Sequence, residues 1–159
     1  MTDLATWARV RPYRGRDESF CLYSWLFTFA RSEHGKRWNA NALRQIGQQD
    51  HVWSEHRPIA LRLLREADTR IACDNDDDDT ILGWACVDGP GVLHYAAVKH
   101  TVGRELAPDV ARLLLGDRLD SPQLVTHEQC GLRVAGVRHV GEWKFDPYWL
   151  ASKWAKEAA

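Results

Sequence analysis

Long apolar runs, paired cysteines and an excess of charge of one sign are all absent from this sequence of 159 residues. The most apolar stretch, Phe20 to Ala30, is far shorter than the roughly 20 residues that a membrane-spanning helix needs. The segment Met1 to Val10 carries charges and has no apolar core of the kind found in secretory signals. We therefore expect neither a membrane partner nor secretion, and the sequence predicts a cytoplasmic protein.

The four cysteines are widely spaced and form no C-x-x-C pair. A zinc site, a redox motif and a disulfide framework are therefore not expected. The formal net charge is -1, which provides no electrostatic basis for binding a nucleic-acid polymer. The eight tryptophans indicate a core or cleft built on large rigid side chains. The length fits one hydrophobic core, so we expect residues 1–159 to form a single domain.

Two features that suggest metal binding have simpler explanations. The run from Asp74 to Asp79 lacks the central glycine and the acidic twelfth position of a calcium loop, so we interpret it as a solvated hairpin turn. His51 and His56 are five residues apart and do not share one helical face. The sequence therefore predicts no metal site.

Hydrophobic periodicity and turn residues predict alternating helices and strands. A short strand within 5–13 precedes a helix that Asp17 caps and that extends to Arg31. A loop at 34–38 leads to a second helical region, capped by Asn39 or Asn41, in which Pro58 introduces a kink or a break. Strands at 69–73, 80–87 and 92–99 then form an antiparallel meander, with turns between them.

The remaining third of the chain begins with the clearest helix, 104–115, which Gly116 ends. A strand is expected at 123–126, and Asp146 caps a final helix with Pro147 at its first position. The apolar spacing between His127 and Gly141 fits either a helix or a strand.

The segment Leu93 to Ala107 passes from a buried strand through a short loop into a helix. A helix start offers unpaired amides and a partial positive charge, both of which suit a phosphate group. Gly103 would let a bulky anion approach the backbone. Joints of this kind are common and most bind nothing, so the joint alone does not identify an anion site.

The residues around this joint resemble a known family. Ile81-Leu82-Gly83-Trp84-Ala85 before the turn and Leu93-His94-Tyr95-Ala96-Ala97-Val98-Lys99 after it are similar to the GCN5-related N-acetyltransferases, in particular to small variants found in phage genomes. The resemblance extends from Ala5 to Leu150. It includes the runs Arg9 to Pro12, Ser24 to Leu26, Val125 to His127 and Trp143 to Tyr148.

The resemblance implies an α+β fold of three layers, with a mixed, mainly antiparallel sheet and helices on both faces. Its fourth and fifth strands are expected to splay apart and to hold acetyl-CoA as co-substrate. The pantetheine would pair with Ala96, Ala97 and Val98, and the pyrophosphate would bind Gly103, Arg104, Glu105, Leu106 and Ala107. This loop departs from the family pattern Q/R-x-x-G-x-G/A, because Val102 and Glu105 replace its first and fourth residues.

Amine acetylation needs a deprotonated amine, a stabilised oxyanion and a proton for the leaving thiolate. His127 is the first catalytic candidate, since imidazole exchanges protons near neutral pH; the alternative role is a helix cap or an exposed side chain. Tyr95 and Tyr148 are further candidates. His94 and Tyr95 are expected on opposite sides of one strand, so at most one faces the cleft. Glu128 is a neighbouring acid.

The predicted function is an acetyl-CoA-dependent N-acetyltransferase that acts on a primary amine by direct attack. The amine belongs to a small molecule, a protein or a modified nucleobase. Nucleic acid is therefore expected as a partner only in the form of a modified-base substrate. The alternative is a catalytically degenerate fold that acts as a binding or inhibitory module, which Val102 and Glu105 favour. The sequence leaves the choice between monomer and dimer open.

Overall fold

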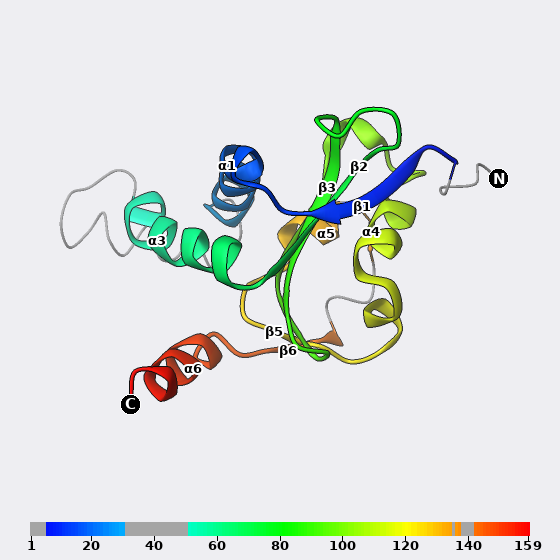
Figure 1. Ribbon diagram of the computed structural model, residues 1–159. Helices are drawn as coiled ribbons and strands as arrows, with labels where there is room; N and C mark the ends of the chain where they lie inside the picture. Colours follow the sequence, from blue (N-terminus) through cyan, green and yellow to red (C-terminus); the bar gives the residue numbers. More distant parts are fainter. Residues whose placement is uncertain (1–5, 31–50, 135, 138–141) are drawn as a thin grey trace.

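One six-stranded sheet forms the centre of the described structure, and its strands follow one another across the sheet in chain order (Figure 1). The strands are β1 (Ala8–Pro12), β2 (Asp68–Asp74), β3 (Ile81–Asp88), β4 (Val92–Val98), β5 (Leu124–Val125) and β6 (Lys144–Phe145). β1 to β4 are antiparallel, whereas β5 lies parallel to β4 and β6 parallel to β5. The structure is a computed structural model that describes residues 6–30, 51–134, 136–137 and 142–159. The expected antiparallel meander is confirmed.

Helices cover both faces of this sheet (Figure 1). One core cluster joins the sheet to α1 (Glu18–Ala30), α3 (His51–Glu66) and α6 (Trp149–Glu157). A second cluster, on the other face, joins it to α4 (Ala107–Leu115). The short helix α5 (Cys130–Val134) packs mainly against β4. The predicted fold class, an α+β fold with a mixed, mainly antiparallel sheet between helices, is therefore confirmed.

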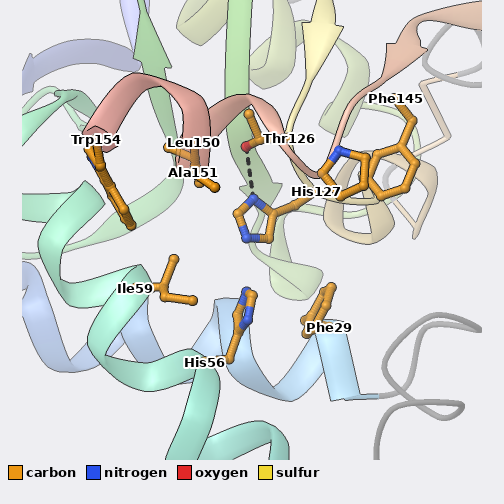
Figure 2. A pocket seen from close by; sticks show the side chains of 10 residues that line it. Phe29, His56, Ile59, Thr126, His127, Phe145, Leu150, Ala151 and Trp154 are labelled. Carbon is orange, nitrogen blue, oxygen red and sulfur yellow. Dashed lines mark hydrogen bonds between the residues drawn. The ribbon is translucent and has the colours of Figure 1, made fainter. Parts of the chain in front are cut away.

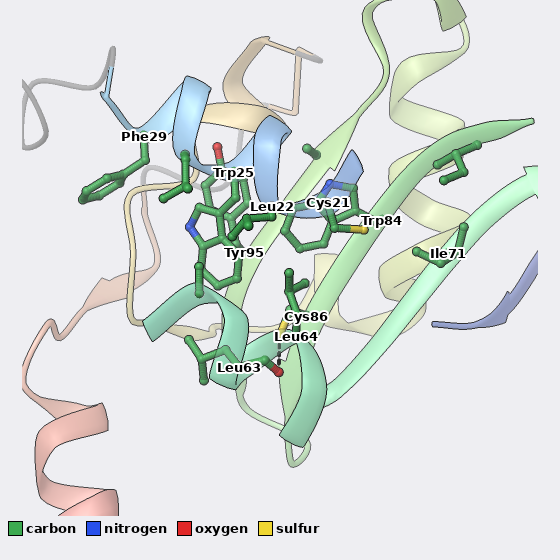
Figure 3. Close-up of a cluster of buried hydrophobic side chains, with 14 of the residues drawn as sticks. Cys21, Leu22, Trp25, Phe29, Leu63, Leu64, Ile71, Trp84, Cys86 and Tyr95 are labelled. Atoms are coloured by element: carbon green, nitrogen blue, oxygen red, sulfur yellow. Dashed lines mark hydrogen bonds between the residues drawn. The ribbon is translucent and has the colours of Figure 1, made fainter. Parts of the chain in front are cut away.

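Burial on both faces explains the nearly continuous apolar sequence of β3. Trp84 and Cys86 belong to the cluster with α1 and α3, whereas Ala85 and Val87 belong to the cluster with α4. Trp25 of α1 lies at the centre of the first cluster (Figure 3): its ring stacks on Tyr95 with centroids 5.2 Å apart and lies 5.5 Å from Trp84. Large rigid rings thus form this core, as the tryptophan content indicates.

Asp17 acts one turn earlier than predicted. It ends the 3-10 turn η2 (Gly15–Asp17), and α1 begins with the next residue. The Asp17 carboxylate accepts the Arg14 amide at 2.8 Å and two bonds from the buried Arg11 guanidinium, at 2.7 and 2.8 Å. Burial works against the charged form, yet the Arg11 and Arg14 hydrogen bonds keep the pKa of Asp17 below its usual value. The carboxylate therefore links β1 to the start of α1.

Pro58 lies inside α3, which is a single helix from His51 to Glu66 rather than two. The segments predicted as a loop at 34–38 and as helix caps at Asn39 or Asn41 lie outside the described residues. The same is true of Leu43 to Gly47, the expected beginning of the apolar stripe.

α4 begins at Ala107, three residues after the predicted start at Arg104. The preceding chain forms the 3-10 turn η3 (His100–Val102) and then turns at Gly103, which has φ +85°. Pro108 occupies the first turn of α4, where its missing amide costs no helical hydrogen bond. Leu106, the N-cap residue, is not the conventional polar cap, and periodicity alone therefore placed the boundary too early.

β6 was not predicted, because two residues carry no readable period. α6 begins at Trp149, with Tyr148 as its N-cap residue. The predicted cap, Asp146, instead accepts the amide of Tyr148 through Oδ1 at 3.0 Å, in the turn before the helix. No helix in the described part of the chain is long and apolar enough to cross a bilayer.

Gly83 permits the close contact between β3 and α4. A Cβ at this position would lie 2.8 Å from the Ala97 carbonyl oxygen and 3.2 Å from Cδ1 of Leu114. We predict that Gly83→Ala lowers the free energy of unfolding by about 1–3 kcal/mol, because backbone or helix must shift. Urea titration of the variant measures this loss.

The matched control is Gly91→Ala, where an added Cβ would meet no atom within 4 Å. Its free energy of unfolding should stay within about 0.5 kcal/mol of the parent protein. Equal losses in the two variants would contradict the close packing of α4 on the sheet.

Candidate functional site

The site begins where β4 and β5 part. The two strands pair only at Val92–Leu124 and Leu93–Val125. The amide of Thr126 then donates to the Leu93 carbonyl at 3.2 Å, just beyond the end of β5. β5 ends at Val125 whereas β4 continues to Val98, so no second strand runs on beside β4, and the splayed pair that the family resemblance implies stays a prediction.

A β-bulge lies next to this point. Cys86 pairs with Tyr95 and Val87 pairs with Leu93, so His94 is an extra residue in β4. The side chains of His94 and Tyr95 consequently project from the same side of the sheet. Tyr95 stacks on Trp25 of α1, and the ring centroids of His94 and Trp149 of α6 are 5.7 Å apart. The expectation that they lie on opposite sides was wrong, because the bulge breaks the two-residue alternation.

The edge of β4 beyond Leu93 is covered by the segment that contains α5. Gln129 donates through Nε2 to the His94 carbonyl at 3.0 Å. Gly131 lies so close that an added Cβ would be 2.5 Å from the Ala96 carbonyl oxygen and 2.7 Å from Cβ of Ala97. Ala96 and Ala97, two of the three residues expected to pair with pantetheine, are therefore buried under α5. The third, Val98, is half-buried at the end of β4.

The predicted phosphate loop is open to solvent. Gly103, Arg104 and Glu105 are exposed, and the positive φ of Gly103 comes with open space around its Cα. Ala107 is buried at the helix start, where its amide donates to the Gly103 carbonyl at 3.0 Å. Leu106 is half-buried between them. An anion could thus reach the amides at the start of α4, where Arg104 would attract it and Glu105 would repel it.

A cavity of about 230 Å³ lies next to the point where the strands part (Figure 2). α1 and α3 form one wall, and the residues that follow β5 together with α6 form the other. Its lining residues are Phe29, His56, Ile59, Thr126, His127, Phe145, Pro147, Leu150, Ala151 and Trp154.

His127, the first catalytic candidate, lies in this cavity and is 5% exposed. Aromatic rings surround its imidazole: the centroid of Trp25 is 5.1 Å away, that of Phe29 5.8 Å and that of His56 4.8 Å. The alternative of an exposed histidine is therefore wrong. His56, which the sequence analysis considered only as a metal ligand, joins His127 as a second imidazole of the cavity (Figure 2).

Thr126 connects His127 to His94. Its hydroxyl oxygen lies 2.9 Å from Nδ1 of His94 and 2.9 Å from Nδ1 of His127. All three side chains are buried. A hydroxyl has one proton and two lone pairs, so it donates to at most one of the two imidazoles and can accept from either.

Asp88 influences which imidazole donates. Its Oδ2 lies 3.5 Å from Nε2 of His94 and forms an ion pair with Lys153. Burial works against ionisation, yet Lys153 holds the pKa of Asp88 below its usual value. A carboxylate attracts a ring N–H and repels a ring lone pair, so the Asp88 charge favours the His94 tautomer with its proton on Nε2, although this nitrogen has no hydrogen-bond partner among the described residues.

The tautomer of His127 follows from that of His94. Nδ1 of His94 has the lone pair and accepts the Thr126 proton, so the Thr126 oxygen accepts a hydrogen bond from Nδ1–H of His127. The lone pair of His127 is then on Nε2, the ring nitrogen on the side of His56 (Figure 2). This is the arrangement of an imidazole base held by a donor bond at its other nitrogen.

The other candidates lie outside this arrangement. Burial raises the pKa of Tyr95, whose hydroxyl is hydrogen bonded to Thr28 and accepts the Gly131 amide at 3.2 Å. Tyr148 is 77% exposed and does not line the cavity. Glu128 is half-buried beside His127 but is likewise absent from the lining. Both tyrosines therefore fit structural positions better than an acid role.

Thr126, Asp88 and Lys153 were missed as site residues. The only signal for Thr126 was its position directly before His127 at a strand end. Asp88 is the last residue of β3, and Lys153 lies 65 residues further along the chain. No spacing rule connects such positions, so only the fold could bring them together.

The buried His94 predicts a pH dependence of stability. Burial lowers the pKa of His94 from 6.5 to about 4, although Asp88 opposes the shift. The unfolded chain therefore binds this proton more readily, and stability falls as the pH drops from 6.5 towards 4. The loss assigned to His94 between pH 7 and pH 4 is about 3 kcal/mol.

Urea titration at several pH values measures this loss. His94→Gln should lose less stability on acidification than the parent protein, whatever its stability at pH 7, because carboxylates contribute equally to both. Identical pH slopes would contradict a neutral, buried His94.

The tautomer of His127 is directly measurable. We predict that long-range proton–nitrogen NMR finds the His127 proton on Nδ1 in the parent protein. Asp88→Asn removes the charge that orients His94 and should increase the Nε2–H form, whereas the exposed Asp117→Asn should not. A parent protein with the proton on Nε2 would contradict the derived order of donors.

Comparison of the chain with protein-family models, with curated proteins and with solved structures finds no match. The chemistry of the site is therefore inferred from its own residues.

Proposed function

We propose that the protein transfers an acyl group, in the simplest case acetyl from acetyl-CoA, to a primary amine bound in the cavity beside His127. The observation that carries this proposal is the buried His127, whose Nδ1 lies 2.9 Å from the Thr126 hydroxyl; in the tautomer that Asp88 favours through His94, its lone pair is on Nε2. Its position at the parting of β4 and β5 is where the family resemblance locates acyl transfer.

His127 would act first as base and then as acid. The amine nitrogen attacks the thioester carbonyl carbon, an N–C bond forms, and the carbonyl π electrons move to oxygen. Nε2 of His127 takes the proton that the nitrogen loses. When the oxyanion collapses, the C–S bond breaks and the thiolate receives that proton from Nε2. The products are an amide and the free thiol, and His127 returns to its neutral form.

The neighbours of His127 support this cycle. The Thr126 oxygen accepts the Nδ1–H bond, and that bond strengthens when the ring becomes an imidazolium. The walls of the cavity are mainly apolar but partly open to solvent, so they exclude water from one side of the reacting groups only. The start of α4, with the open Gly103 before it, supports a phosphate group at the other end of β4.

A second candidate function is a binding module that takes no acyl-CoA. The observation that favours it is the cover on β4, where Gln129 and Gly131 occupy the edge that pantetheine would need. Glu105 adds a negative charge at the predicted phosphate loop. For acyl transfer, α5 has to move away from Ala96. The four cysteines are free thiols, and for either function we propose the cytoplasm as the compartment.

Calorimetry with acetyl-CoA on protein stripped of CoA separates the two candidates. The transferase requires binding, and His127→Gln should slow acyl transfer by at least about 100-fold, the contribution typical of general base catalysis. Its affinity for acetyl-CoA should stay within about twofold, because Nε2 is not assigned to cofactor binding. Thiol release with a panel of amines measures the rate.

Glu128→Gln is the matched control, since it alters the residue beside His127 and should leave the rate nearly unchanged. Absence of acetyl-CoA binding at millimolar concentration would contradict the transferase and favour the binding module. Binding together with an unaltered rate in His127→Gln would remove His127 from the mechanism.

A further inference from the structure

The described walls of the cavity beside His127 are mainly apolar and aromatic. Among the described residues that line it, none is Asp, Glu, Lys or Arg. Its polar side chains are one hydroxyl and two imidazoles, and the hydroxyl of Thr126 is engaged by both His94 and His127. Whatever binds here is therefore surrounded mainly by hydrocarbon and aromatic rings.

The described charged residues next to lining residues in the chain are Glu55, Arg57, Glu128, Lys144, Asp146 and Lys153, and none of them lines the cavity. Asp88 pairs with Lys153, and Asp146 accepts the amide of Tyr148 at 3.0 Å. Neither Asp88 nor Asp146 is a lining residue. The described wall therefore offers no carboxylate to balance an ammonium group.

This wall discriminates between two kinds of amine. An alkylamine is an ammonium ion at neutral pH, and among the described residues no side chain of the wall supplies a counter-ion for the hydration that it loses on binding. An amino group on an aromatic ring is uncharged at the same pH, because its lone pair is delocalised into the ring. It can therefore enter neutral and direct an N–H to Nε2 of His127.

The size and lining of the cavity agree with a flat ring. A cavity of about 150 Å³ holds benzene, and the volume here is about 230 Å³. Phe29 and His56 stack on each other with centroids 4.4 Å apart, and Arg62 lies over the Trp154 ring, so these three side chains offer another ring mainly their edges and remaining faces. Phe145, 42% exposed, marks the mouth. One substituted ring or two fused rings would fit.

We propose that the acceptor is an aromatic amine, uncharged at neutral pH, bound with its ring between α3 and α6 and its amino group at His127. The inference that this amine accepts an acyl group rests on the proposed transferase function. The inference that it binds in the cavity does not, because binding needs only the walls described above.

The test compares aniline with benzylamine, two probes of similar size of which only benzylamine is charged at neutral pH. Ligand-observed NMR titration without acetyl-CoA should find aniline bound at least about tenfold more tightly, a modest share of the cost of burying an unpaired charge. Aniline should also shift the side-chain nitrogen signals of His127. Equal affinities, tighter binding of benzylamine or no aniline binding would overturn the proposal.

Ala151→Phe locates the site. Ala151 lines the cavity, and a side chain added there leans towards the start of α6, near Pro147 and Phe145. The variant should abolish aniline binding. Ala158→Phe, the same change at the exposed C-cap of α6, should retain it. Both positions are exposed, and the urea midpoints of the two variants verify that they fold.

Acetyl-CoA added last separates this inference from the proposed function. Formation of the acetylated aniline supports both. Aniline binding that Ala151→Phe abolishes, without acetyl transfer, would overturn the transferase but leave the aromatic ligand site in place. Binding that persists in Ala151→Phe would overturn the site itself, whatever the outcome with acetyl-CoA.

Discussion

Thr126 makes the contacts on which the site depends. Its amide bonds to the Leu93 carbonyl just beyond the last paired residues of β4 and β5, and its hydroxyl lies between the imidazoles of His94 and His127. Because that hydroxyl has a single proton, it can donate to only one of the two imidazoles. The charge of Asp88, at the end of β3, therefore influences through His94 which nitrogen of His127 carries the proton.

The bulge in β4 makes this chain of contacts possible. Without the extra residue, His94 and Tyr95 would alternate across the sheet. With it, both rings lie towards α1 and α6, where Tyr95 packs on Trp25 and His94 reaches Thr126. A local irregularity in β4 therefore connects the aromatic core around Trp25 with the Thr126–His127 pair of the site. Bulges often re-aim side chains next to functional sites.

Two properties of the site have opposite implications for acyl transfer. The oriented His127 and the mainly apolar walls suit the attack of a neutral amine, whereas the cover of α5 over Ala96 and Ala97 occupies the edge needed by pantetheine. Besides the close contact at Gly131, the buried Leu132 and the hydrogen bonds of Gln129 and the Gly131 amide hold this segment against β4, so these interactions would have to break if α5 moved. The binding of acetyl-CoA is therefore the property that divides an enzyme from a binding module.

The sequence by itself predicted the meander of β2 to β4 and the helices before and after it in the chain, because these depend on periodicity and turn residues. The choice of His127 rests on the chemistry of one side chain and stays a prediction. The sequence misjudged the start of α4 and the relative directions of His94 and Tyr95, since a nonpolar N-cap and a bulge leave no periodic signal. Only the tertiary structure decided that His56, Thr126, Asp88 and Lys153 meet at one site and that α5 covers β4. These contacts join residues far apart in the chain, and they arise from packing rather than from local preference.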